Sequence, residues 1–262
     1  MKSIEHLARY RNFRQVFHDM VDIMLCCLSY GTMEEKYLEI IGKYTEEEVK
    51  VDWPKTIALL QMCYFEGITA DGGWIDPLGD VFMESGSKWS ASGLGQFFTP
   101  EDVCTLLAEL TDRDEEIHTK PFKANDCAAG SGRTLLAYSR RHPSYQRIGT
   151  YIAQDLDQLC VKMCAVNMFF HGLSGYSIHM NTLSMKAFGG YRIYLGQTGL
   201  GIRQVSVNYI CSVLSSPKEE TVDINPGITK LNKPEPATQT NTAPPNTTPM
   251  PKGSQMDLFG GF

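Results

Sequence analysis

The chain has 262 residues, of which 42% are hydrophobic and 21% charged, so we expect a folded protein with a sizeable core. Its formal net charge of −6 excludes a uniformly basic surface, and tight binding to DNA phosphates without a partner is therefore not expected. No apolar run approaches the roughly 20 residues that span a bilayer, and the charged first residues do not resemble a signal peptide, which predicts a cytoplasmic protein without membrane contact.

The first 94 residues are predicted to form a helical region, because their apolar side chains recur at helical spacing. Thr45 and Glu48 have the spacing of a capping box, which marks the start of a helix, and Pro54 suits the first turn of another. Residues 67–95 are rich in Gly, Ser and Asp and are expected to be mostly loop. In chain order, we predict helices over 4–30, over 33–43, after Thr45, after Pro54 and near 77–84.

Strands and helices are predicted to alternate between residues 95 and 215. Thr99-Pro100-Glu101-Asp102 has the residues favoured at a helix start, namely an N-cap Thr, a Pro and two acids. Such alternation indicates βαβ units and a doubly wound parallel sheet, which is an α/β, Rossmann-like architecture. The predicted segments are helix 99–110, strand 122–127, helix 132–141, strand 149–154, helix 157–171, strand 176–180, a flexible hairpin over 189–201 and a last strand over 205–213.

Residues 216–262 are predicted to form a disordered tail. Prolines recur among Thr, Asn and Lys, and large apolar residues are almost absent up to residue 254. Such a segment cannot bury enough surface to offset the entropy lost on ordering. The tail ends in a short apolar tip, Gln255-Met-Asp-Leu-Phe259.

The cysteines are expected to be reduced residues of the core. The chain holds eight, without a CxxC pair or a His/Cys cluster at the spacing of a zinc site. Cys26-Cys27 and Cys160/Cys164 fall inside apolar helical patterns. We therefore expect neither a bound metal nor a disulfide.

Polar features follow three successive predicted strands. The glycines of the turn 128–132 allow close approach to a ligand, and the next helix offers free N–H groups, although such glycines can also serve packing alone. Asp155 follows the next strand, and a carboxylate there can accept both hydroxyls of a ribose. Asn181, followed by Thr182, ends the third strand, and its amide can pair with an adenine edge. Because open α/β sheets bind ligands at the carboxyl ends of their strands, the three features together favour a nucleoside-type ligand.

Four segments of the chain share the order and spacing of a known family. They are GQFFTPEDV (95–103), NDCAAGSGRTLLA (125–137), AQDLDQLCVKMCAVNMFFHGL (153–173) and HMNTL (179–183). Together they resemble the modification (methyltransferase) subunits of type I restriction systems, which belong to the adenine-N6 DNA methylase family. The resemblance covers about residues 90–185. It implies a Rossmann-like fold, S-adenosylmethionine as the cofactor, and DNA as a substrate reached through a partner subunit.

The resemblance also assigns roles to individual residues. It implies that GQFFTP lies against the methionine end of the cofactor, that Asp155 holds the ribose, and that Asn181 touches the adenine ring where the family usually has Asp. The cofactor-binding residues expected in this way are Gln96, Phe97, Thr99, Pro100, Asp126, Ala128, Gly130, Ser131, Gly132, Asp155, Leu156, Asn181 and Thr182.

One part of the family pattern is not found. The family places an Asn/Asp-Pro-Pro-Tyr/Phe motif after the fourth strand, where it holds the target amino group and stacks on the flipped base. Ser215-Ser216-Pro217, after the last predicted strand, lacks both the amide and the aromatic ring. Because methyl transfer requires the acceptor nitrogen in line with the methyl group, we expect a chain that binds the cofactor but transfers methyl groups poorly or not at all, and we assign no catalytic residue.

Two alternatives stay open. The tail tip resembles the short motif by which bacterial proteins dock on the DNA polymerase sliding clamp: Gln255 would fix the orientation, and Leu258 and Phe259 would fill a pocket at the end of a flexible tether. The second alternative is a methylase-shaped scaffold that binds neither cofactor nor clamp, which Asn181 and the missing motif favour.

Overall fold

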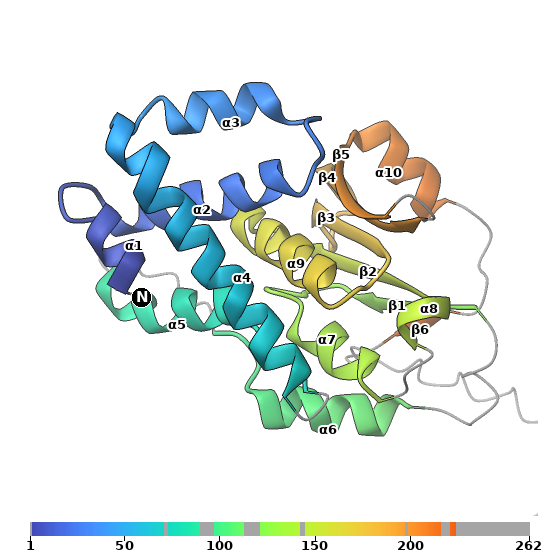
Figure 1. The fold of residues 1–262 in the computed structure, drawn as a ribbon. Helices are drawn as coiled ribbons and strands as arrows, with labels where there is room; N and C mark the ends of the chain where they lie inside the picture. Colours follow the sequence, from blue (N-terminus) through green and yellow to red (C-terminus); the bar gives the residue numbers. More distant parts are fainter. Residues whose placement is uncertain are drawn as a thin grey trace, which may run out of the picture. The chain divides into compact units, whose positions relative to one another are not determined.

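A mixed sheet of six strands forms the centre of the fold (Figure 1). The computed structural model describes residues 2–70, 73–89, 97–112, 121–141, 145–196, 199–215 and 221–223. Within these residues the strand order is β5-β4-β3-β2-β1-β6. The strands are β1 (Phe122–Asp126), β2 (Gly149–Asp155), β3 (Gly175–Asn181), β4 (Lys186–Gly196), β5 (Gly199–Val205) and β6 (Thr221–Asp223). The predicted α/β class is therefore confirmed.

The sheet combines a parallel set of strands with an antiparallel hairpin. β1 pairs in parallel with both β2 and β6, and β2 pairs in parallel with β3. β4 and β5 form the antiparallel hairpin predicted from the glycines 189–201, and β4 pairs with β3. The alternating pattern predicted a parallel sheet, whereas the observed sheet is mixed. Asp126, Asp155 and Asn181 are the last residues of β1, β2 and β3, and they lie at one edge of the parallel set.

The N-terminal region is helical, with two differences from the prediction. Residues 67–95 were expected to be mostly loop with a short helix near 77–84, but among the described residues helices cover Trp53–Thr69 and Pro77–Trp89. The helix predicted over 4–30 is divided in two, because the chain turns after Leu7 and Asn12 caps the second helix by accepting a hydrogen bond from the Arg14 N–H at 2.9 Å. The capping box forms: Glu48 accepts from the Thr45 N–H at 2.7 Å, and the Glu48 N–H donates to the Thr45 hydroxyl at 3.3 Å. The elements are α1 (Lys2–Leu7), α2 (Phe13–Cys27), α3 (Glu34–Ile41), the π-helix η1 (Glu48–Asp52), α4 (Trp53–Thr69) and α5 (Pro77–Trp89).

Helices cover both faces of the sheet. The remaining helices are α6 (Glu101–Thr111), α7 (Arg133–Ser139), α8 (Tyr145–Ile148), α9 (Gln158–Phe170) and α10 (Val207–Leu214). α9 lies on one face, between the sheet and α2, and is buried on most sides (Figure 1). Ser177 of β3 faces α9 and donates to the carbonyl of Val161 at 2.7 Å. The next residue, Ile178, faces the other side, where it packs with Ile210 of α10 in a separate apolar cluster.

The strand predicted over 205–213 is wrong. Only Val205 belongs to a strand, and residues 207–214 form α10. Ser206 caps this helix, because its hydroxyl accepts a hydrogen bond from the Tyr209 N–H at 3.4 Å. The alternation of Val and Ser at the start of the segment suggested a strand, whereas Ile210 and Leu214 follow Val207 at helical spacing.

The predicted tail contributes a strand to the sheet. β6 lies within residues 216–262 and pairs with β1, with Asn125 opposite Asp223. A three-residue strand has little intrinsic preference, so its formation depends on pairing with the buried β1. The tip with Gln255, Leu258 and Phe259 lies outside the described residues, and its contact with a clamp stays a prediction.

Four of the eight cysteines are not core residues. Cys26, Cys104, Cys160 and Cys164 are buried as expected, but Cys27, Cys63, Cys127 and Cys211 are exposed. The helical pattern around Cys27 indicated a helix correctly but not which side of it faces solvent. Among the described helices, none combines the length and apolar character needed to cross a membrane.

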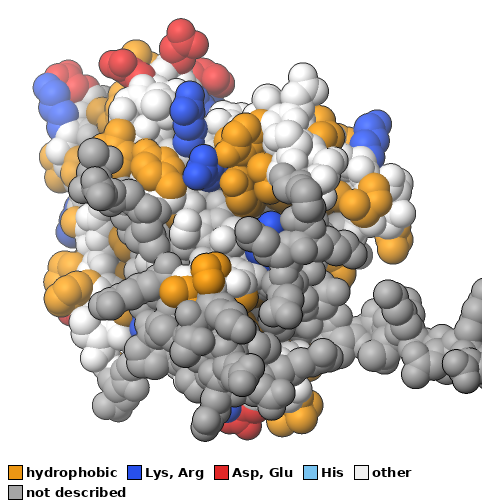
Figure 2. Space-filling view, turned by 90° about the vertical axis from the view of Figure 1, so that its right-hand side faces the viewer, with side chains coloured by type: hydrophobic (Ala, Val, Ile, Leu, Met, Phe, Trp, Pro, Cys, Tyr) orange, Lys and Arg blue, Asp and Glu red, His pale blue; other side chains and the backbone are white. Residues whose placement is uncertain are grey.

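Acidic residues are unevenly distributed along the chain. Residues 158–218, from α9 through α10, contain no Asp or Glu. Arg192 and Arg203 face each other across β4 and β5, and both are exposed. Figure 2 views the molecule from the side that is on the right in Figure 1, where α10 lies. Most of the acidic side chains visible in this view gather at its top, and Lys, Arg and hydrophobic side chains lie below them among other side chains. The negative net charge therefore does not extend evenly over the molecule.

The segment after α2 is hydrogen-bonded to the edge strand β5. The outward-facing N–H of Ile202 in β5 donates to the carbonyl of Leu28, in the segment after α2, at 3.1 Å. The N-terminal region is thereby hydrogen-bonded to the hairpin as well as packed on α9.

Candidate functional site

A pocket opens at the carboxyl edge of the parallel strands. Its volume is about 140 Å³, and it is bounded by the turn after β1, the end of β2, the starts of α7 and α9, and the segment before α6. A concave site with a few converging polar groups is the usual form of a small-molecule site. The lining residues are Phe97, Phe98, Thr99, Asp126, Ala128, Ala129, Gly130, Ser131, Arg133, Thr134, Asp155 and Cys160.

The turn between β1 and α7 requires its glycines. Gly130 has a φ of 55° and Gly132 a φ of 95°, both in the left-handed region. A Cβ on Gly130 would lie 2.9 Å from Cδ1 of Phe98, and a Cβ on Gly132 would lie 2.7 Å from Sγ of Cys164. The turn is therefore held closely between the segment before α6 and helix α9.

Two carboxylates join this turn to the ends of β1 and β2. Oδ2 of Asp155 accepts from the Gly130 N–H at 2.8 Å, and Oδ1 accepts from the Asp157 N–H at 2.8 Å. Asp126 accepts from the Ala128 N–H at 3.0 Å and from the Thr134 hydroxyl.

The two carboxylates differ in their access to the pocket. Asp126 is 3% exposed, and burial raises its pKa although the bonds from Thr134 and Ala128 oppose the shift. Asp155 is only half-buried. Because a carboxylate has about four lone-pair positions, Asp155 can accept further hydrogen bonds from a ligand, whereas Asp126 mainly shapes the turn.

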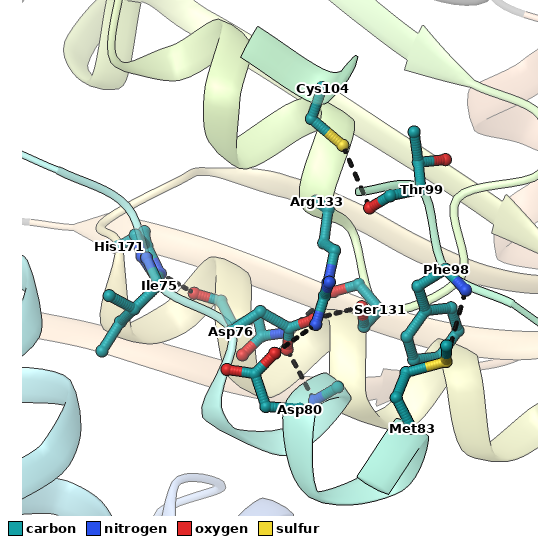
Figure 3. A network of polar contacts seen from close by, with 12 residues as sticks. Ile75, Asp76, Asp80, Met83, Phe98, Thr99, Cys104, Ser131, Arg133 and His171 are labelled. Carbon is teal, nitrogen blue, oxygen red and sulfur yellow. Dashed lines mark hydrogen bonds and ion pairs between the residues drawn. The ribbon is translucent and has the colours of Figure 1, made fainter. Parts of the chain in front are cut away.

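A buried polar network lies behind the turn and reaches the N-terminal region (Figure 3). Its centre is Asp76, which is fully buried just before α5. Oδ1 of Asp76 accepts from the Gly79 N–H at 2.8 Å and from Nδ2 of Asn167 at 2.7 Å. Oδ2 accepts from the Ser131 hydroxyl and from Nε of Arg133 at 2.7 Å. The four lone-pair positions of this carboxylate are therefore all used.

The network extends through Arg133 and Asn167. Nη2 of Arg133 donates to Asp80 at 2.6 Å, and the Tyr64 hydroxyl of α4 donates to Oδ1 of Asn167. Burial lowers the pKa of Arg133, but attraction to Asp76 and Asp80 outweighs it, so the pKa is raised and the guanidinium stays charged. Burial raises the pKa of Asp76, and its ionised form therefore depends on Arg133 and the other donors.

This network was not predicted from the sequence. Asp76 and Ser131 are 55 residues apart, so no local pattern relates them. The only sequence signals were the acidic residues Asp76 and Asp80 in a stretch with apolar neighbours, and an Arg placed directly after the glycine turn.

The predicted cofactor residues are partly brought together. Those that line the pocket are Phe97, Thr99, Asp126, Ala128, Gly130, Ser131 and Asp155. Those that are not among its lining residues are Pro100, Gly132, Leu156, Asn181 and Thr182. Pro100, rather than Thr99 as predicted, is the N-cap of α6. Gln96 lies outside the described residues.

Asn181 is engaged by its own loop. Its Oδ1 accepts from the N–H groups of Leu183 at 3.1 Å and Ser184 at 3.0 Å. The amide oxygen is thus committed to a local turn after β3, and its predicted contact with an adenine ring stays a prediction.

The sequence between α5 and the hairpin matches a known family. Residues 75–200 match the family described as N-6 DNA Methylase. This part of the chain therefore resembles N-6 DNA methylases. The matched part of the chain begins one residue before Asp76 and includes the glycine turn and Asp155, so it contains the pocket and, apart from Tyr64, the network behind it. The family resemblance of the four sequence segments is confirmed.

A solved methylase structure is also similar to this chain. It is the type I restriction-modification system methyltransferase subunit from Streptococcus thermophilus, with 20% sequence identity and a TM-score of 0.37. The similarity covers 62% of this chain and 37% of that subunit, so this chain spans well under half of the subunit's length.

β6 is the fourth strand of the parallel set. Ser215-Ser216-Pro217 was predicted to follow a strand but follows the helix α10 instead. β6 runs parallel to β1 and ends at the same sheet edge as Asp126. The sequence after it, Ile224-Asn225-Pro226-Gly227, has the Asn-Pro pair of the motif but neither the second proline nor the aromatic residue. Residues 224–227 lie outside the described part of the chain.

Proposed function

We propose that this methylase-family chain binds S-adenosylmethionine, takes part in N6-adenine modification of DNA together with a partner, and transfers methyl groups poorly by itself. The observation that carries the proposal is the convergence of the Gly130 turn and Asp155 in one pocket, where the turn's N–H and the carboxylate are bonded to each other.

The pocket residues have the chemistry that this cofactor needs. Asp155 has acceptor capacity left for the two hydroxyls of a ribose. The Phe97 ring is 83% exposed and lines the pocket, where it can cover an apolar part of a ligand. Thr99 offers a hydroxyl beside it, and the left-handed glycines let a ligand approach the backbone. When bound, S-adenosylmethionine would supply the electrophilic methyl group.

The sequence after β6 supports weak catalysis. Asn225 could supply an amide for the target amino group, but Gly227 and Ile228 stand where the family has proline and an aromatic residue. Without the ring, an extruded adenine loses its stacking partner, and its nitrogen is held less firmly in line with the methyl group. A partner chain that holds the base would restore the missing function.

The charge distribution supports a particular side for DNA. The acid-free part of the chain carries the exposed, paired Arg192 and Arg203, whereas the chain as a whole has a net charge of −6. Contacts to DNA phosphates are made mainly by Arg and Lys side chains. We infer that DNA would approach the hairpin side and that overall affinity would depend on the partner.

The proposal is tested with the full chain in two assays. Calorimetric titration with S-adenosylmethionine is expected to give micromolar binding at one site. Incorporation of labelled methyl groups into adenine-containing DNA is expected to be near background for the chain alone. Absence of binding would refute the cofactor site, and efficient methylation by the chain alone would refute the impairment.

A further inference from the structure

Asp76 does not line the pocket, but its bonds reach two residues that do. Ser131 and Arg133 both line the pocket, and both donate to Oδ2 of Asp76. Asn167, bonded to Oδ1 of Asp76 at 2.7 Å, also donates to the carbonyl of Ser131 at 2.8 Å. The side chain and the backbone of Ser131 are therefore both held by the Asp76–Asn167 pair.

The turn needs such support, because it contains two left-handed glycines on either side of Ser131. Glycine loses more conformational freedom than any other residue when it is fixed, so a turn of this composition is intrinsically mobile. A ligand that had to order the turn on binding would bind more weakly, because part of its binding free energy would be spent on ordering the turn. Bonds that hold Ser131 before the ligand arrives remove this loss.

We propose that Asp76 is a positioning residue, which holds Gly130–Gly132 in the conformation that binds the ligand. Through Ser131 it fixes the backbone next to Gly130, and Gly130 in turn bonds to Asp155 at the pocket. The proposal rests on the proposed function for the identity of the ligand, S-adenosylmethionine. It also makes the segment before α5 part of the ligand site, since Asp76 belongs to the N-terminal region.

Asp80 offers a matched control for the charge of Asp76. Both carboxylates bond to the guanidinium of Arg133, at 2.7 Å from Nε and 2.6 Å from Nη2. The Asp76 side chain is 0% exposed and bonds to Ser131 as well, whereas the Asp80 side chain is 60% exposed. Replacing either acid by its amide removes one negative charge beside Arg133, but only the change at Asp76 alters the support of the turn.

The test uses the full chain with Asp76→Asn, Asp80→Asn and Ser131→Ala, and the double variant of Asp76 and Ser131. Asp76→Asn is expected to weaken S-adenosylmethionine binding at least about tenfold, because it removes a buried ionic partner and one acceptor. Asp80→Asn is expected to change it less than about threefold, because the carboxylate is exposed. The double variant is expected to bind about as well as Asp76→Asn alone, because both changes remove the same contact.

A second measurement needs no ligand. Amide hydrogen exchange of the peptide over 126–134, compared with that over 149–155, reports whether the turn has loosened while the sheet remains intact. Asp76→Asn and Ser131→Ala are expected to speed exchange in the turn selectively, and Asp80→Asn is not. The two measurements separate the proposed function from the role of Asp76. If the unchanged chain binds no S-adenosylmethionine, the proposed function is refuted. Hydrogen exchange still shows whether Asp76 holds the turn.

Two results would overturn the proposal. The first is unchanged exchange in the turn of Asp76→Asn. The second is an equal loss of affinity in Asp76→Asn and Asp80→Asn. If Asp76→Asn does not fold, the test rests on Ser131→Ala, which removes only one hydroxyl. Unchanged hydrogen exchange in the turn of Ser131→Ala would then refute the positioning role of Asp76.

Discussion

The N–H of Gly130 lies 2.8 Å from Oδ2 of Asp155, so the turn after β1 and the last residue of β2 support each other. We predict that Asp155→Ala weakens S-adenosylmethionine binding roughly 10- to 100-fold, because hydrogen bonds to a charged group contribute about 1.5–3 kcal/mol. Calorimetric titration measures the loss.

A neighbouring acid provides the control for this variant. Asp157 caps α9 by accepting from the N–H groups of Leu159 at 2.7 Å and Cys160 at 3.4 Å. Asp157→Ala should cost about 1 kcal/mol of unfolding free energy without lowering the affinity. If both variants bind the cofactor as well as the unchanged chain does, Asp155 does not contact it.

Gly130→Ala is predicted to destabilise the protein more than Gly172→Ala does. Gly172 has a φ of 67° and no atom within 4 Å of the position of a Cβ, so the alanine there adds only left-handed strain, about 1–2 kcal/mol. At Gly130 the same strain is joined by a Cβ at 2.9 Å from Cδ1 of Phe98. Chemical denaturation measures the difference in unfolding free energy. Equal losses in the two variants would show that the Phe98 side chain can shift without an energetic cost.

Stability is predicted to fall as the pH drops from about 6.5 to about 4, because of His171. This side chain is 2% exposed, and its Nε2 accepts from the Ile75 N–H at 3.2 Å. Burial lowers its pKa from 6.5 to about 4. Between these values the unfolded chain binds a proton that the folded chain does not, so the unfolding free energy rises with pH, by up to about 3 kcal/mol in total.

His171→Gln removes this titration and keeps an acceptor for the Ile75 N–H. Urea denaturation at several pH values should therefore give a flatter dependence for His171→Gln than for the unchanged chain. An unchanged slope in His171→Gln would assign the acid sensitivity to other groups.

Completing the motif after β6 is predicted to raise methyl transfer. The double substitution Gly227→Pro and Ile228→Tyr adds the second proline and the aromatic residue behind Asn225-Pro226. Stacking of a base on an aromatic ring contributes about 1–3 kcal/mol, which predicts a gain of roughly tenfold in labelled methyl incorporation into DNA. Asn225→Ala in the same background should remove the gain. If the double variant methylates no better than the unchanged chain, the segment after β6 does not hold the target base.

The sequence predicted those elements whose signals are local. β1, β2 and β3 have buried apolar residues between polar turns, and Asp155 and Asn181 were predicted at the ends of the second and third strands, where the structure has them. The resemblance placed Asp155 and the Gly130 turn in one site, and the structure brings them into direct contact.

Other features could not be predicted, because they depend on distant partners. β6 forms in a polar, proline-rich segment only because β1 pairs with it. Asp76 looked like an acid in a loop, and its role depends on Ser131 and Asn167, which lie 55 and 91 residues away. The error at 205–213 was different in kind, since the spacing of Val207, Ile210 and Leu214 already favoured a helix.

The bond between Ile202 and Leu28 has a consequence for aggregation. An uncovered edge strand presents a row of unpaired N–H and C=O groups, to which a strand of another chain can add. At Ile202 the segment after α2 occupies that position. At this position β5 is therefore closed to a strand of another chain, which protects this part of the sheet edge from strand addition.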